Sequence, residues 1–266
     1  MDIQKLKKIV EFSDKNRDQI QAKVDRFYAI SGFPQEREIL NMMQIVSMVV
    51  LEQGYLVLEI PFADREIGAM CYKGDALGYI LLNTSLPKVN VNFALCHEVY
   101  HVLEQKVSGK AKLEFANEHY YEHESEFEAN LFAGMLMMPE TGFKFMYRKF
   151  KEEANSSEEN IILKLMNYYQ APYMAVLIRC LELNLDEFDV PKLLAYSDGD
   201  RIREKFADLW LDESILNATQ KDDYAQLEAV VKRLGNEAIN GTFLKERTVK
   251  KVLQNMRTLY LDIKGE

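Results

Sequence analysis

The sequence predicts an α+β protein in which a small antiparallel sheet lies among helices and a mostly helical region follows. Two observations predict this class. Between residues 55 and 82, three short runs are rich in leucine, β-branched and aromatic residues and are separated by turn residues. Nearly all of the remaining chain repeats its apolar residues at helical spacing. One group of strands with helices before and after it is typical of the α+β class.

The composition is that of an ordinary globular protein. The chain has 266 residues, of which 48% are hydrophobic and 28% are charged, so it can bury a substantial core. Its net charge is −9 and its sequence pI is about 5.2. An acidic chain is poorly suited to broad binding of nucleic-acid phosphates, and we expect no direct nucleic-acid partner.

The sequence also indicates where the protein resides. The N-terminus is not followed by an apolar run of signal-peptide length, and no stretch approaches the length of a membrane span. The three cysteines are odd in number and widely spaced, which fits reduced thiols better than a disulfide framework. We therefore expect a cytoplasmic protein without a membrane partner.

The N-terminal part is predicted to be helical. Residues 3–28 carry apolar side chains at helical spacing, and Gly32 ends the pattern. A second helix is expected to begin at Pro34 and to end at Gly54; it is too apolar to lie on the surface. We assign residues 1–35 to a separate N-terminal helix.

Three strands are predicted next, at residues 55–62, 67–72 and 77–82. Pro61 closes the first, and turn residues separate the second from the third. If the third strand lies at the edge of the sheet, it could bind an extended substrate as an added strand. A helix is expected to follow from about Asn90.

The rest of the chain is predicted to be helical after a loop at 108–121. Helices are expected at 122–138, 141–153, 161–169 and 173–183, and across much of 186–266. The pair at 161–183 resembles a helix-turn-helix, but its second helix has one basic residue, Arg179. We interpret the pair as structural, because a helix that reads a DNA groove needs more positive charge.

The strongest chemical signal is His97-Glu98-Val-Tyr-His101, an H-E-x-x-H run within a predicted helix. Residues four apart lie on one helix face, about one turn from each other. Two imidazoles so placed can bind one Zn²⁺, with Glu98 beside the metal as general base. The alternative is a surface helix with two solvated histidines.

A catalytic zinc site needs a third protein ligand. Glu104 lies too far along the helix axis to complete the site. A second helix offers Glu126 and Asn130, which are four residues apart and share a face. One of them can ligate the metal while the other orients a ligand histidine. The histidine three residues before Glu126, His123, is a minor alternative ligand.

The two motifs together resemble the ImmA/IrrE family of zinc metallopeptidases. The H-E-V-Y-H run is followed, after 24 residues, by E-x-E-A-N-x-F-A-G-x-L-M-M-P, and Phe-Ala-Leu precedes the first histidine by one residue. The likeness covers about residues 40–185. It implies a zincin-like metallopeptidase domain at 36–185, followed by a helical region at 186–266 for docking or regulation.

The resemblance also implies roles for single residues. His97, His101 and Glu126 would ligate one Zn²⁺, Glu98 would activate water, and Asn130 would hold a ligand histidine. The oxyanion could be stabilised by side chains just before the second helix: His119, Tyr120, Tyr121 and His123.

The sequence departs from the family pattern at two positions. Tyr100 stands where relatives have Gly and could narrow or reshape the cleft. Asn130 stands where many relatives have Asp, and an uncharged partner should make the histidine less basic.

By analogy with the family, the function is expected to be zinc-dependent, site-specific proteolysis. The substrate would be a helix-turn-helix repressor or an antitoxin of a phage, mobile element or stress operon. The alternative is a catalytically weak or inactive zinc-binding protein that binds its partner stoichiometrically.

Overall fold

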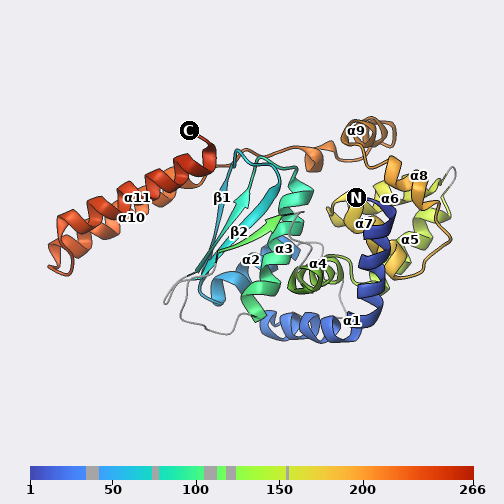
Figure 1. Cartoon of the computed structure of the whole chain (residues 1–266), viewed down its shortest axis with the longest axis horizontal. Coiled ribbons are helices and arrows are strands. Elements are labelled where there is room, and N and C mark those ends of the chain that lie inside the picture. Colours follow the sequence, from blue (N-terminus) through green and yellow to red (C-terminus); the bar gives the residue numbers. More distant parts are fainter. Residues whose placement is uncertain (34–41, 74–77, 105–112, 118–123, 154–155) are drawn as a thin grey trace.

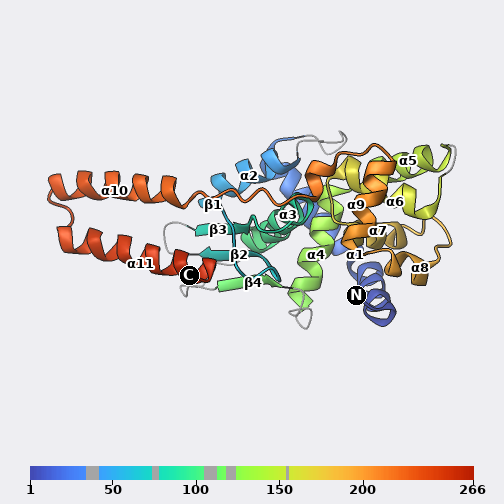
Figure 2. The ribbon, with the colours of Figure 1, turned by 90° about the horizontal axis from the view of Figure 1, so that it is seen from above.

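The computed structural model describes residues 1–33, 42–73, 78–104, 113–117, 124–153 and 156–266. It confirms the α+β class. Helices cover one face of a small sheet, and a helical hairpin extends from the sheet at the C-terminal end of the chain (Figures 1 and 2). No helix among the described residues is both long enough and apolar enough to cross a membrane.

The N-terminal helix α1 (Ile3–Ser31) begins where the Asp2 side chain accepts a hydrogen bond from the Lys5 backbone N–H. It ends at Gly32, whose φ of 69° suits a residue without a side chain. Its buried face packs against α4 and α7 in the main core. The helix thus shares a core with the domain that follows, and the division at 1–35, 36–185 and 186–266 stays a prediction.

The sheet contains β1 (Tyr55–Ile60), β2 (Ile67–Lys73), β3 (Gly78–Asn83) and β4 (Leu113–Asn117), in the order β1-β3-β2-β4. The prediction of an antiparallel sheet is wrong for one pair, because β1 and β3 are parallel. The chain leaves β1, passes the place that β3 later fills, and returns through β2. β3 runs antiparallel to β2 and therefore parallel to β1.

One further prediction about the sheet is wrong, and the condition for a substrate strand beside residues 77–82 is not met. Within the predicted loop at 108–121, β4 pairs antiparallel with β2, which satisfies backbone groups that a loop would leave to water. The predicted strand 77–82 corresponds to β3, which lies between β1 and β2 and is not an edge. Substrate cannot add to β3, and the edges among the described strands are β1 and β4.

The helices of the main core follow the predicted order. α2 (Met42–Glu52) and α3 (Lys88–Glu104) pack on each other, α3 lies against the sheet, and α4 (Glu124–Met137) lies beside α3. The predicted start of the second helix at Pro34 lies outside the described residues. α5 (Glu140–Lys151), α6 (Glu158–Tyr169) and α7 (Tyr173–Glu182) complete this layer.

The one basic residue in the second helix of the α6–α7 pair is held in the core. Arg179, the basic residue of its second helix, is only 2% exposed. Its Nε donates to the Met138 carbonyl oxygen at 3.1 Å, and its Nη1 contacts Glu182 Oε2 at 3.0 Å. A guanidinium held in the core in this way cannot reach a DNA groove.

The C-terminal region contains α8 (Val190–Ala195), α9 (Gly199–Asp208), the short 3₁₀ helix η2 (Glu213–Leu216), α10 (Tyr224–Asn240) and α11 (Glu246–Lys264). The last turns of α11 cover part of the sheet, where Tyr260 and Ile263 pack on a small apolar cluster. That cluster comprises Ile60, Phe62, Met70 and Leu81. The sheet thereby anchors one end of the α10–α11 hairpin.

Candidate metal centre

The helix α3 places the two histidines of the H-E-x-x-H run on one face. His97 and His101 are both buried, and their Nε2 atoms lie 3.2 Å apart. One helical turn separates them, so the local fold alone brings both ring nitrogens to one point. The alternative of two solvated histidines does not describe this structure.

The neighbouring helix α4 supplies the carboxylate. Glu126 lies in the first turn of α4, with its Oε2 3.1 Å from His97 Nε2 and its Oε1 3.4 Å from His101 Nε2. One ligand atom from each of the three residues lies within 4.8 Å of the others. No other group of three metal-ligating side chains occurs among the described residues. Two imidazoles and a carboxylate are the donor set of a catalytic zinc site, so these residues fit Zn²⁺.

Asn130 lies one turn further along α4 and holds His97 from the other side of its ring. His97 Nδ1 lies 2.9 Å from Asn130 Oδ1, which accepts the Nδ1 proton. The Nε2 lone pair is then directed toward Glu126 and is available to a metal. The structure thus distinguishes the roles of Glu126 and Asn130, between which residue spacing alone does not choose. Glu126 contacts the histidine nitrogens that face the cluster, and Asn130 orients the ring of His97.

The electrostatics of the cluster suit a cation. Burial by itself lowers the pKa of His97, but the hydrogen bond to Glu126 and the negative charges of Glu98 and Glu126 outweigh it. The pKa of His97 is therefore raised. The carboxylates of Glu98 and Glu126 thus make the surroundings of His97 negative, which suits a cation.

Removing the hydrogen bond to His97 should weaken metal binding. We expect Asn130→Ala to lower zinc affinity by about 10-fold to 100-fold, because the ring is then free to rotate and to change its tautomer. Competition against a chromophoric zinc chelator measures this. The exposed Asn236→Ala on α10 is the control, and equal affinities for the two variants would contradict the role of Asn130.

Glu98 follows His97 on α3 and is almost completely buried, at 1% exposed. Its charge is among those that raise the pKa of His97, which places the carboxylate close to the cluster. A carboxylate held beside the metal is what a general base for water requires.

The side chain of Tyr100 contacts residues of α1 and α4. Its hydroxyl accepts a hydrogen bond from Lys23 Nζ at 2.7 Å and donates one to Glu128 Oε2. The ring is buried between α1 and α4. Its centroid lies 5.8 Å from the ring centroid of Phe132 and 5.5 Å from that of His101. The bulky side chain therefore ties three helices together.

No pattern in the sequence indicates which residues surround Tyr100. Lys23 Nζ lies 3.4 Å from Glu104 and 3.7 Å from Glu128, so one lysine from α1 joins acidic residues of α3 and α4. Burial and the hydrogen bond to Glu128 raise the pKa of Tyr100, which keeps its hydroxyl protonated. These partners are far apart in the sequence, and no local pattern relates them.

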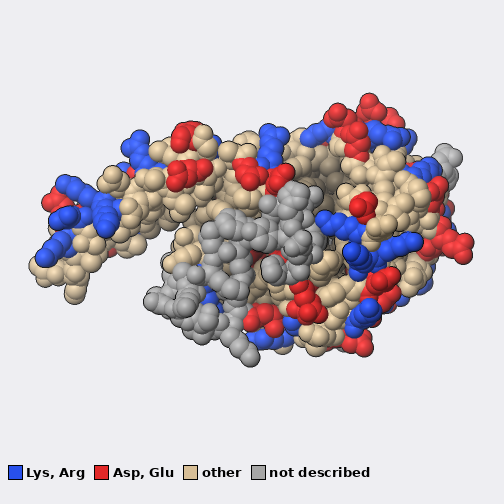
Figure 3. Space-filling model, viewed as in Figure 1, with Lys and Arg blue, Asp and Glu red and all other residues tan. Residues whose placement is uncertain are grey.

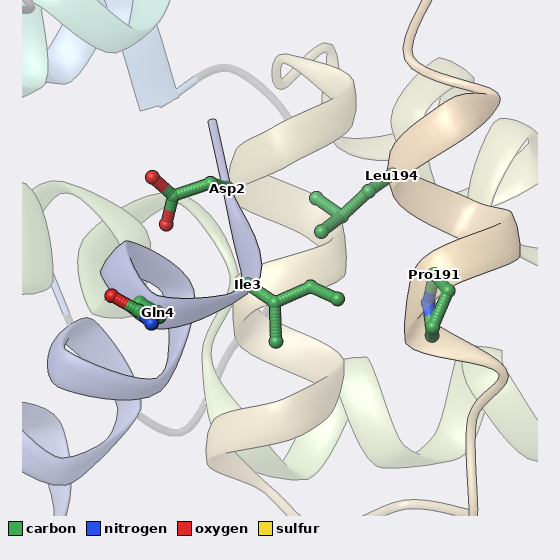
Figure 4. Close-up of a pocket in the computed structure, with 5 residues that line it drawn as sticks. All are labelled: Asp2, Ile3, Gln4, Pro191 and Leu194. Atoms are coloured by element: carbon green, nitrogen blue, oxygen red, sulfur yellow. The ribbon is translucent and has the colours of Figure 1, made fainter.

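Two other regions lie outside the described cluster. His119, Tyr120, Tyr121 and His123 lie outside the described residues, and their role as oxyanion stabilisers stays a prediction. A hollow between α1 and α8, shown in Figure 4, is lined by Asp2, Ile3, Gln4, Pro191 and Leu194. It shares no residue with the metal cluster.

Comparison with known proteins assigns the domain that holds this cluster. Residues 51–181 match Peptidase_M78, described as the IrrE N-terminal-like domain, and no curated protein matches the chain. The match runs from β1 into α7 and therefore contains His97, Glu98, His101 and Glu126. The resemblance visible in the two motifs is confirmed, and residues 51–181 of this chain form a domain of the ImmA/IrrE family of peptidases.

Proposed function

We propose that the protein is a zinc-dependent endopeptidase that cuts a helix-turn-helix repressor or an antitoxin at one site. The observation that supports this most is the cluster of His97, His101 and Glu126, with ligand atoms within 4.8 Å of each other and Glu98 buried beside it. The family match supports a peptidase in general. The choice of a repressor as substrate follows from analogy within the family.

The residues present define the steps that the protein itself performs. His97, His101 and Glu126 would hold the zinc ion, and Asn130 fixes the ring of His97. Zinc in such a site makes water more acidic and polarises the scissile carbonyl group. Glu98 then accepts the proton of the attacking water and delivers it to the leaving amine.

The outer edge of β4 is a place where an extended substrate could bind. β4 contacts α3 and has a single strand neighbour, β2, among the described residues. Its other edge can pair with the backbone of an unfolded peptide segment. This edge replaces the strand at 77–82 that the sequence suggested, and it favours substrates with a locally extended segment.

The proposal is tested by incubating the zinc-loaded protein with the helix-turn-helix protein encoded nearest to its gene. We expect two fragments from a single cut, identified by intact-mass spectrometry, and no cut by His101→Ala, which lacks a ligand. An intact partner held in a tight complex by the wild type would instead establish stoichiometric binding. An intact partner that does not bind at all would contradict the proposed substrate.

A further inference from the structure

The hairpin of α10 and α11 stands away from the rest of the molecule. Both ribbon views show its far half extending past the sheet, with the α10–α11 turn at the free end (Figures 1 and 2). Val249 is the only residue that the two helices bury fully. Several large apolar side chains of the two helices therefore stay exposed to solvent.

The two helices pack on each other along a seam that can be traced at two points. The rings of Tyr224 and Tyr260 stack with their centroids 3.9 Å apart near the sheet. Further out, Gly235 lies against Val249, since a Cβ added to the glycine would fall 2.5 Å from Val249 Cγ1. This close approach fixes which sides of α10 and α11 face each other.

A second apolar stripe lies beside the seam. Val230 and Leu234 on α10 are 44% and 50% exposed, and Val252 and Leu259 on α11 are 46% and 47% exposed. Leu234 and Leu259 directly precede two seam residues, Gly235 and Tyr260, and so lie about 100° around their helices from the seam. Val230 and Val252 lie about one and two turns before Leu234 and Leu259 and share their helix faces. Because the helices are antiparallel, this step turns both stripes to the same side of the hairpin. The four residues define one two-helix surface, here called the hairpin face.

We propose that the hairpin face binds the hairpin face of a second copy, giving an antiparallel four-helix bundle. A two-fold axis lets the same apolar residues meet in both copies. Helices of this length give a face roughly 25 Å long and 20 Å wide, or about 500 Å² for each copy. The pair would bury about 1,000 Å² in total, which reaches the lower limit for a specific interface.

Charge decides between the parallel and the antiparallel arrangement. Lys and Arg gather at the free end of the hairpin, in Lys245, Arg247, Lys250 and Lys251 (Figure 3), although the whole chain is acidic. A parallel pair would bring these cations together. Lys251 and Asp262 are exposed, lie three turns apart on α11 and share the edge of the hairpin face. In an antiparallel pair, Lys251 of each copy approaches Asp262 of the other.

The first test is the oligomeric state of the full chain by sedimentation equilibrium at several concentrations. We expect a dimer for the wild type, and at least about a 100-fold rise in the dimer Kd for Leu234→Glu with Leu259→Glu. Phe145→Glu, at an exposed position of α5, is the matched control and should leave the dimer intact. Circular dichroism checks that all variants keep their helices.

The second test exchanges the charges. Lys251→Glu and Asp262→Lys should each weaken the dimer by about tenfold, and the two changes in one chain should restore it. A wild type that stays monomeric at about 100 μM would overturn the proposal, and binding of heparin by that monomer would point to an acidic partner instead. The proposal would also be overturned if Leu234→Glu with Leu259→Glu left the dimer Kd unchanged. The same holds if Lys251→Glu with Asp262→Lys failed to restore the wild-type Kd.

Discussion

Glu98→Gln is expected to lower the rate of peptide cleavage by about 1,000-fold while leaving the zinc content unchanged. Glutamine keeps the size of the side chain but cannot accept the proton of the attacking water, and general acid–base catalysis typically contributes factors of this order. Glu98 is not one of the three residues whose ligand atoms converge. Metal binding should therefore survive the change, and the loss should fall on the chemical step.

The measurement is the single-turnover cleavage rate with the zinc content determined on the same sample. Glu104→Gln is the matched control, because Glu104 lies on the same helix and pairs with Lys23 instead of the cluster. Its rate should stay close to that of the wild type. A Glu98→Gln enzyme that retains zinc and cleaves at the wild-type rate would rule out Glu98 as the base.

The sequence predicted the half of the site that a single helix builds. The spacing of His97 and His101 is enough, because helical geometry places residues four apart on one face whatever surrounds them. The pairing of Glu126 with these histidines depends on how α4 packs against α3. Spacing narrowed the third ligand to Glu126 or Asn130, and the family motif was needed to choose between them.

The features that were missed depend on contacts between distant parts of the chain. The five residues of β4 carry no clear strand pattern, and pairing with β2 is what orders them as a strand. The parallel pairing of β1 with β3 depends on the path of the chain, which periodicity does not encode. The position of Tyr100 was missed for the same reason, since its hydroxyl partners, Lys23 and Glu128, come from two other helices.

Arg179→Met is expected to destabilise the fold by about 3–5 kcal/mol, because it leaves the buried carboxylate of Glu182 without its guanidinium partner. Both side chains are nearly inaccessible, at 2% and 4% exposed. The change also removes the hydrogen bond to the Met138 carbonyl oxygen. Equilibrium unfolding in urea measures the loss, which corresponds to a fall in Tm of roughly 10 °C. Arg247→Met, at an exposed position of α11, is the control and should change little.

The pH dependence identifies the cause of this loss. Burial raises the pKa of Glu182, and the charge of Arg179 opposes that rise. Without the guanidinium, the pKa of Glu182 rises further above its ordinary value of 4.5, so the folded variant binds a proton more tightly than the unfolded chain does. The deficit of Arg179→Met should therefore shrink as the pH falls from about 8 to about 5.

A second substitution separates the lost charge pair from lost packing. Arg179→Met with Glu182→Met removes both charges and should recover much of the stability, because apolar side chains can replace a buried ion pair at little cost. If packing or the bond to Met138 dominated, the double variant would be at least as unstable as Arg179→Met, with a deficit independent of pH. Recovery would show that Arg179 neutralises a buried carboxylate, which accounts for a basic residue at this buried position of α7.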